Sequence, residues 1–156
     1  MFTEQEGKIP TSCTQKESTC VCAPIDLVWN LFRDFKFDQL APNRIKFTKF
    51  LEGQPGMVGS TVAIYYADDS CWCVRITEIS DKYNRICFDL VKAEPATKVS
   101  SVETEIQLHA CTLDNCTCVI WCSEFSNDCD ANTIQDSKYK KHDFFNDMKA
   151  HMASKQ

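Results

Sequence analysis

The sequence predicts an α+β protein in which a curled antiparallel sheet of seven strands packs around one long C-terminal helix. Three observations predict this fold. Residues 12–125 consist mainly of short segments in which apolar and polar side chains alternate with period two between turn residues. Residues 130–152 are the one long segment with helical spacing. The apolar stripe of that segment is too thin for an isolated helix, so we expect it to lie against the sheet.

The C-terminal helix is expected to begin at Asp130 or Asn132, because a short polar side chain there accepts hydrogen bonds from the first free N–H groups. Phe145, Met148 and Met152 recur at i, i+3 and i+7 and form its apolar face. The side chains expected on the solvent face are Lys138, Lys140, Lys141, Asp143, Asp147 and Lys149.

The N-terminal part predicts one strand followed by two short helices. The strand is expected over residues 12–22. The first helix is expected to start at residues 23–26, where Pro24 fits the first turn because its missing N–H has no partner there anyway, and to carry Leu27, Val28, Leu31 and Phe32 on its apolar face. A second short helix or turn over 34–40 is stopped by residues 41–43. Residues 1–11 are expected to be a flexible lead-in to one ligand-binding domain that spans residues 1–156.

Six further strands are expected, with clear alternation in most of them. Their approximate ranges are 44–51, 62–66, 72–77, 85–90, 102–109 and 116–125. One apolar face per strand means that one face of the sheet is covered. A single helix covers such a face incompletely, so the remaining space is either packed with side chains or left as a cavity.

Composition excludes several classes of function. The chain of 156 residues is long enough for a sizeable core, and its net charge of −5 argues against nucleic acid or an anionic membrane as the main partner. No apolar run approaches the ~18 residues that a membrane span needs. The acidic, polar start does not resemble a signal peptide, so we expect a cytoplasmic protein without stable membrane insertion.

The chain is rich in cysteine, with eleven residues of this type. The odd number argues against a disulfide framework. Three Cys-x-Cys pairs occur, at Cys20 and Cys22, Cys71 and Cys73, and Cys116 and Cys118. On a strand each pair would place two thiols on one face, which is a conceivable soft-metal site, although zinc cysteines are usually spaced more widely on turns. We therefore expect small buried thiols that are mostly reduced, with no bound metal and no cofactor.

Several short sequences follow one another in a fixed order along the chain. They are Ala23-Pro24, Val28-Trp29, Asp34, Gly56-Met-Val-Gly59-Ser60, Trp72-Cys-Val-Arg-Ile-Thr-Glu-Ile79, Thr117-Cys-Val-Ile-Trp121 and Glu124-Phe125. Over residues 12–152 this order resembles the helix-grip superfamily, which includes the birch-pollen-allergen-like proteins, the steroidogenic-acute-regulatory-related lipid-transfer domains and the polyketide cyclase/dehydrase group. The resemblance implies a pocket between the sheet and the C-terminal helix.

Carried onto this sequence, the resemblance and the alternation select the same inward faces. The pocket positions that they imply are Ile45, Phe47, Ile64, Tyr66, Trp72, Val74, Phe88, Leu90, Trp121, Ser123, Phe145 and Met148. Thr104 joins them because, like Tyr66 and Ser123, it brings a hydroxyl to an apolar face, and a few placed hydroxyls orient a ligand in such sites. The gate loop of the plant hormone receptors is absent, and no set of catalytic residues transfers.

These features favour a non-enzymatic carrier or sensor of a small hydrophobic molecule such as a lipid, polyketide or sterol. Two alternatives stay open. One is a cyclase, dehydratase or isomerase that acts in the same pocket, for which Arg75 and Glu103 or Glu105 would have to point inward; the alternation places them outside. The other is a thiol-rich interaction protein.

Overall fold

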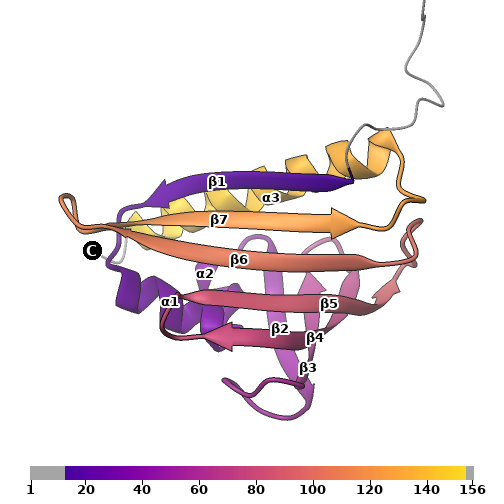
Figure 1. Ribbon diagram of the computed structural model, residues 1–156, viewed down its shortest axis with the longest axis horizontal. Helices are drawn as coiled ribbons and strands as arrows, with labels where there is room; N and C mark the ends of the chain where they lie inside the picture. Colours follow the sequence, from indigo (N-terminus) through magenta and orange to yellow (C-terminus); the bar gives the residue numbers. More distant parts are fainter. Residues whose placement is uncertain (1–12, 154–156) are drawn as a thin grey trace, which may run out of the picture.

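The computed structural model describes residues 13–153, in which seven strands and three helices form the predicted α+β architecture (Figure 1). The helices are α1 (Ile25–Arg33), α2 (Phe37–Leu40) and α3 (Ala131–Ala153). The strands are β1 (Thr14–Val21), β2 (Ile45–Glu52), β3 (Thr61–Tyr66), β4 (Cys71–Ser80), β5 (Arg85–Glu94), β6 (Val102–Cys111) and β7 (Cys116–Phe125). The predicted lead-in, residues 1–11, and the predicted start of the first strand at Ser12 lie outside the described residues.

The seven strands form one antiparallel sheet in the order β1-β7-β6-β5-β4-β3-β2. Five of the six neighbouring pairs are consecutive in the chain and are joined by hairpins or short loops. The sixth joins β1 to β7, with a regular register from Thr14 opposite Glu124 to Val21 opposite Thr117. The prediction that the first and last strands are adjacent is therefore confirmed.

Helix α3 runs along β1 and β7, and α1 and α2 lie near the end of the sheet where α3 finishes (Figure 1). Its start is capped by Asp130, whose Oδ1 accepts hydrogen bonds from the backbone N–H of Thr133 at 2.8 Å and from its hydroxyl at 2.8 Å. Phe145, Met148 and Met152 are all buried, as their spacing predicts. None of the helices in the described part of the chain is long and apolar enough to cross a membrane.

Aromatic rings fill the centre of the space between the sheet and the helices. The ring centroids of Phe35 and Phe37 lie 4.5 Å apart, those of Phe35 and Phe88 5.1 Å apart, and those of Trp121 and Phe144 5.0 Å apart. Phe35 has a φ of 56°, a left-handed conformation that costs about 1–2 kcal/mol for a residue with a side chain. Because of this turn α2 begins at Phe37, three residues later than predicted. The ring contacts of Phe35 offset the strain.

The inward face of β2 differs from the predicted one. Sequence alternation pairs Ile45 with Phe47, but the register with β3 shifts between these two residues, which indicates a β-bulge. An extra residue reverses the alternation, so Thr48 and Phe50 face the core beyond it. Phe47 is 46% exposed and stacks on Tyr65 at 4.3 Å between centroids on the outer face. The expectation that Phe47 lines the pocket is therefore wrong.

Candidate ligand-binding site

Six of the thirteen predicted pocket residues are apolar side chains of the closed core. They belong to one cluster between the sheet and the helices and are at most 5% exposed; they are Ile45, Ile64, Val74, Phe88, Phe145 and Met148. They pack against the aromatic rings of the core, so in this conformation they stabilise the fold and line no cavity. Side chains therefore fill the centre of the space between the sheet and the helices.

The other apolar positions, Tyr66, Trp72, Leu90 and Trp121, are only half-buried although they lie on the same side of the sheet as the core. The nearby first half of α3, residues 131–140, contains no fully buried side chain. Solvent therefore reaches the inner side of the sheet around these rings. The space between sheet and helix is closed at its centre and incompletely covered where α3 begins.

A buried ammonium contacts one of two neighbouring buried hydroxyls beside this incompletely covered region. Thr104 and Ser123 are opposite each other on β6 and β7, and both are buried. The Nζ of Lys141 donates a hydrogen bond to Ser123 Oγ at 2.9 Å and another to Ser137 Oγ at 2.6 Å. Ser137 in turn donates to the side-chain oxygen of Gln15 on β1 at 3.4 Å. Polar groups from three elements, α3, β7 and β1, thus converge on one point.

The position of Lys141 corrects the prediction that it lies on the solvent face of the helix, because the residue is only 4% exposed. A signal for this was present in the sequence. Lys141 lies four residues before Phe145 and seven before Met148, so it belongs to the same stripe as these apolar residues. The prediction grouped it by residue type with the neighbouring lysines rather than by helical position.

The ammonium of Lys141 has no direct ion-pair partner among the described residues. Among residues 13–153, no carboxylate oxygen lies within 4.0 Å of its Nζ. Burial lowers the pKa of Lys141 to about 8, although Cys122 and Glu17 oppose this effect slightly. A buried cation without an anion costs several kcal/mol, so this position favours an added anionic or strongly polar oxygen.

The charged side chains considered for acid–base chemistry lie elsewhere. Arg75, Glu103 and Glu105 are exposed on the outer face of the sheet, as the alternation predicts. Burial raises the pKa of Tyr66 above its usual value, and the nearby Asp68 and Cys71 raise it further. Tyr66 therefore keeps its proton at neutral pH. It thus offers a neutral hydroxyl on the inner side of the sheet.

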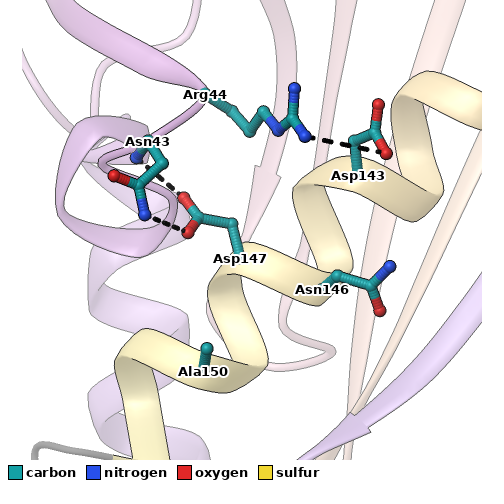
Figure 2. A pocket seen from close by; sticks show the side chains of 6 residues that line it. All are labelled: Asn43, Arg44, Asp143, Asn146, Asp147 and Ala150. Carbon is teal, nitrogen blue, oxygen red and sulfur yellow. Dashed lines mark hydrogen bonds and ion pairs between the residues drawn. The ribbon is translucent and has the colours of Figure 1, made fainter.

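Two hollows open on the surface. The first has a volume of about 500 Å³ and is lined by Asn43, Arg44, Asp143, Asn146, Asp147 and Ala150 (Figure 2). Its polar groups bond one another: Asn43 donates to Asp147 through its backbone N–H at 2.8 Å and through its amide at 2.7 Å, and Arg44 lies 3.8 Å from Asp143. These interactions connect the segment before β2 to α3.

The second hollow, of about 130 Å³, includes four carboxylate residues of the outer face. Its lining residues are Thr77, Cys87, Asp89, Glu103, Thr104, Glu105, Cys122 and Glu124. Apart from Thr104, neither hollow is lined by a predicted pocket residue.

Seven antiparallel strands in this order, two short helices after β1 and a long C-terminal helix along the inner face define the helix-grip fold. Solved structures share it. A protein from Nitrosospira multiformis has a TM-score of 0.78 and 19% identity, over 92% of this chain and 99% of that one. Ginseng major latex-like protein 151 from Panax ginseng has a TM-score of 0.71 and 18% identity, over 90% and 99%. Ara h 8.0201 has a TM-score of 0.71 and 17% identity, over 90% and 97%.

These identities are low, so the likeness establishes the fold and leaves the ligand open. Comparison of the sequence itself finds no matching family model and no matching curated protein. The predicted helix-grip resemblance is confirmed at the level of structure.

Proposed function

We propose that the protein binds one small hydrophobic molecule with an acidic end, between the sheet and the first half of α3. The observation that carries this proposal is Lys141, a buried ammonium that only neutral hydroxyls contact among the described residues. A ligand carboxylate beside Nζ would supply the missing negative charge. Such a charge-assisted hydrogen bond is about twice as strong as a neutral one.

The apolar part of the ligand would lie against the half-buried rings. Tyr66, Trp72 and Trp121 keep part of their surface in water, and covering apolar surface contributes about 25 cal/mol for each Å². Because aromatic side chains fill the centre of the fold, the ligand must enter where α3 begins. Residues 131–140 bury no side chain fully, so this part of the helix can move away from the sheet with little loss of apolar burial.

Dodecanoate and dodecanol, which differ only in the end group, test the proposal by isothermal titration calorimetry. We expect the wild-type protein to bind one molecule of dodecanoate more tightly than dodecanol. Lys141→Met keeps the length of the side chain and removes the charge, so it should weaken dodecanoate binding tenfold or more and leave dodecanol binding nearly unchanged.

Lys138→Met is the matched control, because Lys138 is an exposed lysine on the same helix. It should change neither affinity; an equal loss in this variant would assign the effect to general surface charge. Trp121→Ala should weaken both ligands, and Glu103→Ala, on the outer face, neither. A folded wild-type protein that binds neither ligand contradicts the proposal.

A further inference from the structure

Three neighbouring strands place six potential metal ligands on the outer face of the sheet, near the β6–β7 hairpin. In one row across the strands, Cys20 of β1 lies opposite Cys118 of β7, and Cys118 lies opposite His109 of β6. In the next row Cys116 lies opposite Cys111. Cys22, two residues after Cys20, follows the end of β1. We call Cys20, Cys22, His109, Cys111, Cys116 and Cys118 the thiol array.

The array faces away from the core. Val21, Thr117 and Val119, which alternate with its members on β1 and β7, are fully buried. Cys20 and Cys22 are exposed, and the other three thiols of the array are half-buried. The expectation that the cysteines serve as small buried side chains is wrong for this group, and Cys129 is the one buried cysteine of the eleven. Packing therefore does not explain the array.

The thiols of the array are close enough to influence one another. Directly opposite residues of antiparallel strands have Cβ atoms about 4.5–5.5 Å apart. Partial burial and the nearby thiol of Cys20 raise the pKa values of Cys111 and Cys118, and partial burial and Cys22 raise that of Cys116. Cys20 and Cys22 therefore lie near the thiols of β6 and β7, as the register of the strands implies.

The cross-strand arrangement supplies the further ligands that a single Cys-x-Cys pair lacks. Two thiols on one strand lie side by side but have no third ligand to close a site. Here the register brings sulfur from β1, β7 and β6 together and adds one imidazole. Thiolate-rich sets of this kind select soft ions such as Cu(I) and Zn²⁺ over Mg²⁺ or Ca²⁺.

We propose that the thiol array binds a soft metal ion, with Cu(I) as the ion that fits it best. Within residues 13–153 no three ligating groups already converge on a common point. Binding therefore requires rotation of side chains about χ1, which the exposed position of Cys20 allows. A metal with a low coordination number needs the fewest such rotations. Each bound thiol releases its proton to solvent, and the copper enters and stays as Cu(I), so no electron is transferred.

Anaerobic titration of the reduced protein with Cu(I) held by a chromophoric chelator tests this site. We expect the wild-type protein to withdraw at least one equivalent of Cu(I) from the chelator. Simultaneous Cys20→Ser, Cys111→Ser and Cys118→Ser should reduce the affinity tenfold or more. The matched control replaces Cys71, Cys73 and Cys87, which lie on the outer face of β4 and β5 but have no thiol opposite them on a neighbouring strand, and should keep the wild-type affinity.

A second measurement needs no variant. Cu(I)-loaded and metal-free wild-type protein are treated with iodoacetamide, and the modified cysteines are mapped by mass spectrometry. Copper should protect Cys20 and Cys118 and leave Cys71 and Cys73 as reactive as in the metal-free protein. Equal protection of both groups, an unchanged affinity of the array variant, or equal losses in both triple variants would overturn the proposal.

Discussion

The pH dependence of stability should reveal the buried charge of Lys141. Its pKa in the folded protein is about 8, below the ordinary value of 10.5, so the unfolded chain binds more protons between these values. Stability therefore rises with pH across this window, and the full penalty is present below it. Lys141→Met removes the penalty, so the difference in unfolding free energy between variant and wild type should shrink as pH rises from about 8 to 10.5.

Urea unfolding at a series of pH values measures this difference. Comparison with the wild type cancels the titration of the cysteines that do not interact with Lys141; Cys122 interacts with it, so both proteins carry Cys122→Ser in this measurement. Lys138→Met should show no pH-dependent difference from the wild type. A constant difference for Lys141→Met across the window would show that the amine is already neutral or well solvated.

A row of three carboxylates crosses the outer face of the sheet. Asp89 lies opposite Glu103, which lies opposite Glu124. Like charges directly opposite each other destabilise a sheet, so Glu103→Gln should raise the unfolding free energy by about 0.5 kcal/mol. Thermal unfolding at low and high salt tests the cause, because salt screens the repulsion. A gain that persists at high salt would point to a cause other than charge.

At the scale of elements, Asp128 connects the β5–β6 loop to the β7–α3 loop. Its carboxylate accepts hydrogen bonds from the backbone N–H of Ser100 at 3.0 Å and from the hydroxyls of Ser100 and Ser126 at 2.5 Å each. These bonds, those of Ser100 first, lower its pKa to about 2. The connection is therefore complete above about pH 4 and is lost as pH falls toward 2.

Asp128→Ala should loosen both loops with little effect on the sheet. Hydrogen exchange monitored by mass spectrometry should become faster at residues 95–101 and 126–130 and stay unchanged in β6 and β7. Asp114→Ala, in the β6–β7 hairpin, is the control and should leave these loops unchanged. Uniformly faster exchange over the whole chain would instead indicate global destabilisation.

The elements were predictable where one local pattern decides them. Strand β6 alternates without interruption, and its inward Thr104 and outward Glu103 and Glu105 lie as predicted. Strand β2 departs because a bulge adds a residue, and no residue type in β2 marks its position. The left-handed Phe35 was equally hidden, since its conformation depends on ring contacts with residues far along the chain.

At the scale of the whole molecule, the order of elements was enough to predict the sheet, the adjacency of its first and last strands and the position of the terminal helix. The candidate site was only partly predictable. Alternation assigns a residue to a face, and it identified Thr104, Trp121 and Ser123 correctly in this respect. It cannot distinguish a packed interior from an open one, because that depends on how rings from α2, β5 and α3 meet.

The pairing of β1 with β7 also determines when the protein can finish folding. Residues 14–21 have their strand partner at 117–124, about a hundred positions later, and α3 follows that partner. During synthesis β1 therefore stays unpaired until β7 has left the ribosome. Such distant contacts slow folding, because the entropy of closing a long loop is lost before the contacts form. Until β7 is available, the unpaired backbone of β1 is where we expect this chain to be most prone to aggregation.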